Sequence, residues 1–176
     1  LIATGSDWFV NWADYPQVAA FEDGSLMAFF LQKSGEGTFS YDIKTTFTKN
    51  GVDWSEPKTL HDDGTQTEHG FGSMIPWENN MLITWLDGRN TLGGSHDHAN
   101  HDGHAGQMNL RAAVLTSDGE KIEDWLLDDR VCDCCQTSVT LFENAPMVFF
   151  RDRSQEEFRD MGMVRFVDNS GKTLLE

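Results

Sequence analysis

The chain has 176 residues, 39% of them hydrophobic and 11% aromatic, which favours a folded domain with a sizeable core over a disordered segment. Thirteen basic against 29 acidic residues give a formal charge of −16, which opposes binding to nucleic acid phosphates and anionic membranes. No apolar run is long enough to span a bilayer, and no basic and apolar leader opens the chain. We therefore expect neither nucleic acid nor a membrane as a partner. An acidic, solvated surface does not by itself indicate any other partner.

One pattern recurs three times along the chain: a short apolar strand, a turn, and a second apolar strand that ends among charged residues. The copies lie at residues 15–30, 71–87 and 137–152. A repeat of about 50 to 65 residues is typical of propeller blades, in which each unit is a small sheet that cannot bury its faces alone. The repeat therefore predicts an all-β propeller rather than an isolated sheet.

Turn signals divide each repeat into about four short strands. Asn50-Gly51 follows a strand expected as an outer one at 38–48, and Asp118-Gly119 and Ser170-Gly171 occupy the matching places further on. We expect a single propeller segment, 1–176, of three four-stranded antiparallel blades at about residues 8–62, 67–129 and 131–176. Residues 91–107, which are polar and rich in His, are expected to form an inserted loop in the second blade.

Several motifs resemble those of the sialidase-like superfamily of propellers, whose blades carry the BNR repeat or Asp box. Residues 47–54 and 167–174 resemble degenerate Asp boxes: the first keeps the Gly and Trp, the second the Gly and Thr. The strongest likeness is to a bacterial group with four motifs, found here at residues 68–71 (EHGF), 85–89 (WLDGR), 132–137 (CDCCQT) and 151–154 (RDRS). The resemblance covers nearly the whole chain and implies six blades. It also implies a secreted or periplasmic glycoside hydrolase of exo-sialidase type, with the missing blades supplied by more chain or by a second copy.

The chain departs from the sialidase pattern at one place. Sialidases of this superfamily bind the substrate carboxylate with three arginines, the first in an Arg-Ile-Pro motif, because a guanidinium pairs bidentately with a carboxylate. The aligned residues here are Ala13-Asp14-Tyr15-Pro16-Gln17, without an Arg. We therefore expect little or no release of sialic acid.

Inner-strand ends of neighbouring blades converge near a propeller axis, so charged residues at these ends are candidates for one polar axial pocket. Carboxylates suit acid and base catalysis, and guanidiniums suit an anionic or polyhydroxyl ligand. We predict that the pocket binds or hydrolyses a glycan or another polar small molecule. The alternative is a salt-bridge network that braces the blades. The catalytic candidates are Asp14, Asp87 and Glu68, and the ligand-binding candidates are Tyr15, His69, Arg89, Arg151, Asp152 and Arg153.

Three cysteines, Cys132, Cys134 and Cys135, stand within four residues of one another. Soft thiolates at this spacing could bind Cu(I) or Zn(II). A disulfide between two of them is a second interpretation, and simple burial of small apolar thiols is a third.

The inserted loop supplies further metal-ligand candidates, because His96, His98, His101 and His104 are spaced like a flexible divalent-metal loop. A solvated, weakly binding tract is the alternative. Cu or Zn is thus the candidate cofactor. The competing functions are a non-catalytic metal-binding propeller that uses the Cys cluster and the His loop, and an interaction scaffold.

Overall fold

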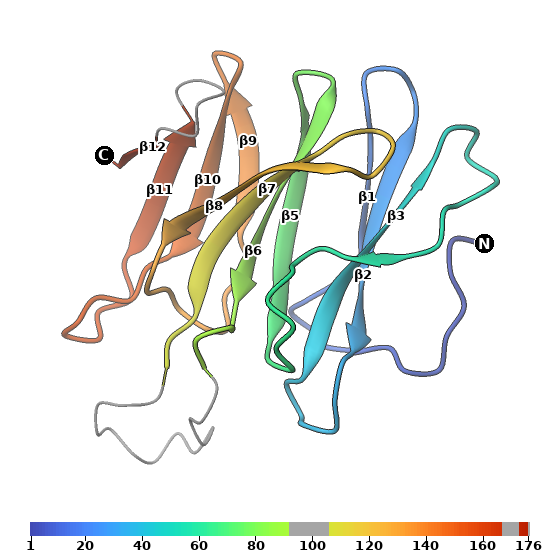
Figure 1. Cartoon of the computed structure of the whole chain (residues 1–176). Helices are drawn as coiled ribbons and strands as arrows, with labels where there is room; N and C mark the ends of the chain where they lie inside the picture. Colours follow the sequence, from blue (N-terminus) through green and yellow to red (C-terminus); the bar gives the residue numbers. More distant parts are fainter. Residues whose placement is uncertain (92–105, 167–172, 176) are drawn as a thin grey trace.

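The computed structural model describes residues 1–91, 106–166 and 173–175, and within these ranges the chain forms strands and no helix. Hence no described segment is a helix that could cross a membrane. The strands, shown in Figure 1, are β1 (Gln17–Ala20), β2 (Leu26–Lys33), β3 (Tyr41–Thr48), β4 (Lys58–Thr59), β5 (His69–Trp77), β6 (Asn80–Asp87), β7 (Asn109–Leu115), β8 (Lys121–Asp128), β9 (Ser138–Phe142), β10 (Ala145–Arg151), β11 (Met161–Phe166) and β12 (Thr173–Leu175).

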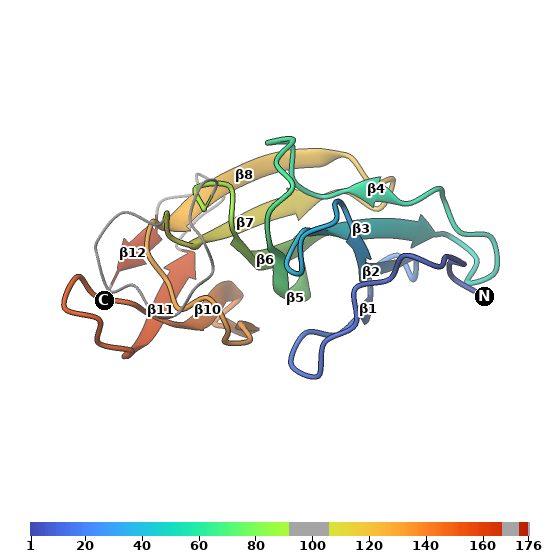
Figure 2. The ribbon, with the colours of Figure 1, turned by 90° about the horizontal axis from the view of Figure 1, so that it is seen from below.

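The strands form three four-stranded antiparallel sheets, each built from strands consecutive in the sequence. The orders are β1-β2-β3-β4, β5-β6-β7-β8 and β9-β10-β11-β12, so that each sheet is an up-and-down meander. Viewed from below, the sheets follow one another along an arc (Figure 2). The all-β, propeller-like fold expected from the repeats is thus confirmed.

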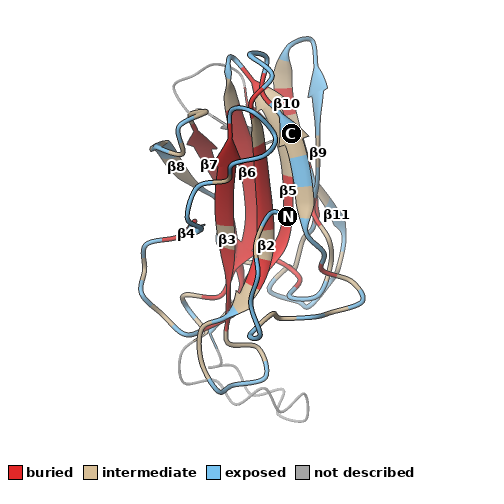
Figure 3. Cartoon of the chain, turned by 90° about the vertical axis from the view of Figure 1, so that its right-hand side faces the viewer, coloured by how far each residue is buried: buried red, intermediate tan, exposed pale blue. Residues whose placement is uncertain are grey.

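The second sheet lies between the other two, and side chains of its strand β6 pack against both neighbouring sheets. Side chains alternate between the faces of a strand. Met81, Ile83 and Trp85 pack into a core shared with the first sheet, whereas Leu82 and Leu86 pack into a core shared with the third. Because both faces are buried, β6 is an almost continuous apolar run, and Figure 3 shows it buried together with β3 of the first sheet.

The first strand of each sheet lies on the inner side of the arc, and β5 contacts both β1 and β9. The carbonyl of Gly72 in β5 accepts hydrogen bonds from Gln17 Nε2 at 2.9 Å and Gln136 Nε2 at 2.7 Å. The three sheets are therefore tied together at one point of the inner surface.

That point is a β-bulge. Between the pairs Gly70–Leu86 and Ser73–Thr84, β5 has two residues where β6 has one, and Phe71 there has a φ of 53°. A bulge re-aims neighbouring groups and often lies near functional sites. Here it turns the Phe71 backbone amide toward the first sheet and its carbonyl toward the third.

The turn predictions hold in part. Gly51 and Gly119 have φ values of 72° and 81°, in the left-handed region, and Gly119 lies in the short β7–β8 turn. The connection after Asn50-Gly51 is longer than a tight hairpin, because β4 begins only at Lys58. The strand expected at 38–48 is β3, the third of its sheet, and the short β4 forms the outer edge. Ser170-Gly171 and most of the predicted insert, residues 92–105, lie outside the described residues.

Candidate functional site

Three side chains from two sheets meet on the inner side of the fold. The hydroxyl oxygen of Tyr41 lies 3.1 Å from Asp14 Oδ2 and 3.0 Å from Glu68 Oε1. Asp14 precedes β1, Tyr41 begins β3 and Glu68 precedes β5, and Tyr41 and Glu68 also form an isolated parallel backbone bridge. We call this group the carboxyl–tyrosine cluster. It contains two of the predicted catalytic residues, Asp14 and Glu68, and a tyrosine that the sequence analysis missed.

The backbone around this cluster is shaped to let the groups approach. A β-carbon on Gly70 would lie 2.1 Å from Asp14 Oδ2 and 2.6 Å from the Tyr41 hydroxyl. The amide of Phe71 donates a hydrogen bond of 2.8 Å to Asp14 Oδ2. Phe9 stacks on the Tyr41 ring, with the ring centroids 3.7 Å apart. The absence of a side chain at Gly70 thus makes room for the cluster, the Phe71 amide holds Asp14, and the Phe9 ring holds Tyr41.

Burial alters the proton affinity of both carboxyls. Asp14 is 3% exposed, and burial raises its pKa to about 6 against the lowering effect of its hydrogen bonds from Phe71 and Tyr41. Glu68 is 8% exposed, and burial, with the negative charges of Asp133 and Asp14, raises its pKa to about 7. Burial and the two carboxylates also raise the pKa of Tyr41, which keeps its hydroxyl protonated.

The hydrogen count agrees with these shifts. A phenol has one proton and can donate to only one carboxylate, so the other short contact is best satisfied by a protonated carboxyl that donates to the hydroxyl oxygen. Near neutral pH the cluster therefore holds an exchangeable proton, which is the property of a general acid.

A second group of predicted residues, His69, Asp87 and Arg89, lies in a separate network. Arg89 binds Asp87 through both oxygens, at 2.7 and 2.8 Å, and Trp85 Nε1 donates to Asp87 Oδ2 at 2.9 Å. Burial alone would raise the pKa of Asp87, but the Arg89 hydrogen bonds and the His69 charge lower it. The structure thus favours the ionised form of Asp87, and the catalytic role expected for this residue stays a prediction.

This network reaches into the first sheet through stacked imidazoles. The rings of His61 and His69 are parallel within 6°, with centroids 3.5 Å apart. Asp63 Oδ2 lies 3.0 Å from His61 Nδ1 and 3.2 Å from His69 Nε2, and Asp42 Oδ1 lies 3.3 Å from His61 Nε2. Burial and the neighbouring His61 lower the pKa of His69. These contacts resemble a bracing network between two sheets, the alternative that the sequence left open.

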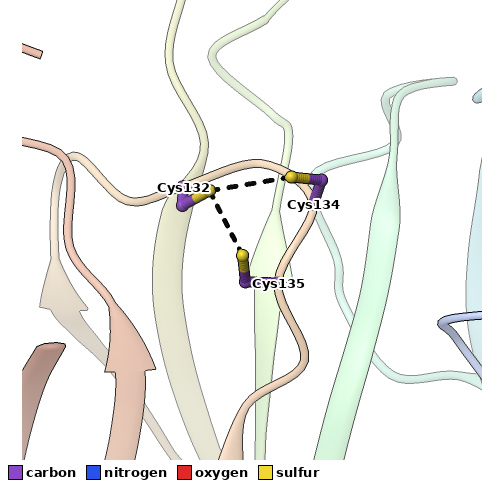
Figure 4. A group of neighbouring side chains, drawn as sticks. All are labelled: Cys132, Cys134 and Cys135. Carbon is purple, nitrogen blue, oxygen red and sulfur yellow. Dashed lines mark hydrogen bonds between the residues drawn. The ribbon is translucent and has the colours of Figure 1, made fainter. Parts of the chain in front are cut away.

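The three cysteines come together in the loop that leads into β9 (Figure 4). Cys132 Sγ lies 3.7 Å from Cys134 Sγ and 3.4 Å from Cys135 Sγ, and all three are free thiols. Burial acts to raise the pKa of Cys132, but hydrogen bonds from Cys134 and Cys135 lower it. Burial and Cys132 together raise the pKa of Cys134 to about 12. Cys132 is thus the thiol that ionises most readily and stands between the other two.

The remaining predicted ligand-binding residues lie near the Cys cluster or in solvent. Arg153 Nε pairs with Glu157 Oε2 at 2.9 Å. Arg151 is exposed, and its Nε donates to the Arg159 carbonyl. Asp152 Oδ1 accepts a hydrogen bond from the Arg153 amide, and Tyr15 is 50% exposed.

A surface pocket lies at the opposite end of β5 from Glu68, lined by Trp77, Glu78, Asn80, Val114, Ile122, Glu123 and Trp125.

By their direct contacts the predicted site residues divide into three groups, and a shared axial pocket stays a prediction. The sequence did not single out Tyr41, His61, Asp42 or Asp63, and Gly70 was noted only as part of the motif at 68–71. The His-Asp-Asp-Gly run at 61–64 was an available signal for part of the network, whereas a tyrosine within a strand gave none. His96, His98, His101 and His104 lie outside the described residues.

Comparison with known proteins gives a fold relationship. No protein-family model matches the chain, and no curated protein matches it. Among solved structures, the Hadza microbial sialidase Hz136 is similar, with a TM-score of 0.64 at 14% sequence identity. The likeness covers 93% of this chain but 37% of the sialidase, so the chain spans little more than a third of that protein's length. The chain therefore has a sialidase-like propeller fold.

Proposed function

We propose that the chain is part of a sialidase-like propeller that binds or hydrolyses a glycan-type ligand, with Glu68 as its proton donor. The observation that carries this proposal is the Tyr41 hydroxyl held between two buried carboxyls, Asp14 and Glu68. Glycoside hydrolysis requires a carboxyl that is still protonated near neutral pH, so that it can protonate the leaving oxygen.

Glu68 suits that role better than Asp14. The pKa of Glu68 is raised to about 7, and its side chain retains some exposure to solvent. Asp14 is more deeply buried, and it accepts a hydrogen bond from the Phe71 amide in addition to its contact with Tyr41. In this proposal Glu68 gives its proton to the glycosidic oxygen as the bond from that oxygen to the anomeric carbon breaks. A water molecule adds to the anomeric carbon, and the proton that this water releases restores Glu68. Asp14 and Tyr41 act as positioning residues.

The arginines support a neutral polyhydroxyl ligand over an acidic one. Arg89 pairs with Asp87 through Nε and Nη2, and Arg153 pairs with Glu157 through Nε, so both guanidiniums already have acidic partners. The missing Arg beside Asp14 points the same way.

We further propose that additional blades complete the propeller, from more of the same chain or from a second copy. The outer sheets expose apolar side chains that another blade would cover: Val18 in β1, and Leu141, Phe142 and Phe149 in β9 and β10. The length relationship to the sialidase supports the same proposal.

The test is a panel of neutral and acidic chromogenic glycosides, together with glycan binding by calorimetry. We expect Glu68→Gln to lower kcat by about 10²-fold or more while leaving binding largely intact. Arg165→Gln, which changes a half-buried residue of β11 paired with the exposed Glu143, is the control and should match the parent protein. Hydrolysis that is unaffected by Glu68→Gln would refute the assignment, and neither binding nor turnover on any glycan would favour an interaction scaffold.

A further inference from the structure

The Cys cluster has the dimensions of a metal site. In a tetrahedral zinc site with Zn–S bonds of about 2.3 Å, neighbouring sulfurs lie about 3.8 Å apart. The distances from Cys132 Sγ to the other two sulfurs are 3.7 and 3.4 Å, slightly below that value. All three sulfurs lie within 4.8 Å of one another. Small rotations of the side chains would open the cluster to the spacing of bound zinc.

From this geometry we propose that Cys132, Cys134 and Cys135 bind one zinc ion and leave its fourth position open. The three side chains point toward a common space from one short loop (Figure 4). No fourth His, Cys, Asp or Glu of the described residues groups with them. Three protein ligands with an open position are the pattern of zinc sites that take up water or a small ligand.

The loop is anchored as a ligand-bearing segment needs to be. The Cys132 amide donates to the Arg151 carbonyl at 2.9 Å, and Thr137 Oγ1 donates to the Phe71 carbonyl at 2.7 Å. The loop is thus fixed on both sides of the three thiols before any ion is bound, which lowers the ordering cost of binding.

The charges near the sulfurs are also suitable. Three thiolates with Zn²⁺ have a net charge of −1, and the positive charges of Arg151 and Arg159 act on Cys135 and Cys132. Asp133 opposes them from within the loop. The flanking cations therefore compensate a thiolate-rich metal centre.

A disulfide fits the structure less well. A disulfide bond is about 2.05 Å long, so either pair would have to close by more than 1 Å. That movement would pull on a loop whose two ends are hydrogen-bonded to β10 and β5. It would also leave the third thiol unpaired.

The buried histidines are a weaker candidate for the same ion. Ring-nitrogen lone pairs lie in the plane of each imidazole, and the planes of His61 and His69 are parallel. The lone pairs of the two rings therefore lie in separate planes, and one ion bound by both would lie out of the plane of at least one ring. Both oxygens of the nearby Asp87 are already engaged by Arg89.

The experiment compares metal content in the parent chain and two variants, all purified without chelator from zinc-supplemented medium. We expect about one zinc per chain in the parent and at least a tenfold loss of retained zinc in Cys134→Ser. Cys134 is exposed, so this substitution should leave the fold intact, which circular dichroism would verify. Thr140→Ala, an exposed change in β9, is the matched control and should retain zinc.

Two spectroscopic measurements identify the ligands. Cobalt(II) bound in place of zinc should give an intense thiolate-to-metal charge-transfer absorption that is reduced in Cys134→Ser. Replacing His96, His98, His101 and His104 by Gln should leave this absorption unchanged. Zinc held equally by Cys134→Ser but lost from the histidine variant would overturn the proposal. So would a disulfide found by mass spectrometry, or binding of Cu(I) without measurable binding of zinc.

Discussion

Gly70 lies so close to Asp14 that a β-carbon at position 70 would stand 2.1 Å from the carboxylate oxygen Oδ2. Gly70→Ala should therefore displace the carboxyl–tyrosine cluster and destabilise the fold by about 1–3 kcal/mol. Chemical denaturation would measure this loss. Gly51→Ala provides a control, because Gly51 has a positive φ but no neighbour within 4 Å of the added carbon. Its cost should be about 1 kcal/mol from backbone strain, with the Glu68 pKa unchanged.

Tyr41→Phe removes the hydroxyl but keeps the ring that stacks on Phe9. Tyr41 has one hydrogen to donate, and its hydrogen bond lowers the pKa of the carboxyl that accepts it, Asp14 or Glu68, so the substitution should raise the pKa of that carboxyl further. NMR titration of the carboxyl carbons would detect the shift. We also expect a loss of about 1–3 kcal/mol in stability, since two buried carboxyls lose a partner. Unchanged carboxyl titration in this variant would contradict the bridging role of Tyr41.

The raised pKa values of Asp14 and Glu68 predict a stability that falls as pH rises. Their usual values are 3.8 and 4.5, and the folded chain raises them to about 6 and about 7. Between these limits the folded state binds more protons than the unfolded state, so the contribution present below about pH 4 is lost by about pH 7. Its size is on the order of a few kcal/mol. The double variant Asp14→Asn, Glu68→Gln should flatten this slope in urea denaturation measured from pH 4 to 8.

Arg89→Met tests the network behind the histidines. Asp87 is fully buried and bound by Arg89 through both oxygens, so the substitution leaves a buried carboxylate without its main partner. We expect a loss of about 3–5 kcal/mol in the free energy of unfolding. Arg165→Met breaks a solvent-accessible pair with Glu143, whose side chains are 38% and 70% exposed, and should cost less than about 1 kcal/mol. Equal losses in the free energy of unfolding for the two substitutions would show that the buried Arg89–Asp87 pair stabilises the fold no more than a surface pair.

Sialic acid should not be released from standard sialoside substrates, because no Arg stands beside Asp14 and Arg89 and Arg153 are engaged with acidic partners. A coupled assay for free sialic acid would measure this. Robust release that disappears in Arg151→Ala would prove the prediction wrong, since it would show that the exposed Arg151 binds the substrate carboxylate.

The sequence was informative wherever neighbours in the chain are also neighbours in space. The two-faced apolar run of β6 and the closeness of Cys132, Cys134 and Cys135 follow from local pattern and spacing. The meeting of Asp14, Tyr41 and Glu68 does not, because it depends on a bridge between two sheets and on the bulge at Phe71. Neither the relative shift of two blades nor a single extra residue in a strand has a signature in side-chain alternation.

Phe71 donates through its amide to Asp14 and accepts through its carbonyl from Thr137, two residues beyond Cys135. Phe71, which has a left-handed backbone conformation, thus links Asp14 of the first blade to the cysteine loop of the third blade through its own amide and carbonyl. Protonation of Asp14 would weaken the hydrogen bond that its carboxylate accepts from the Phe71 amide. The Phe71 carbonyl accepts the hydrogen bond from Thr137 at the end of the cysteine loop. The Asp14 carboxyl and the loop that carries the cysteines therefore share Phe71 as a hydrogen-bond partner, although they belong to different sheets.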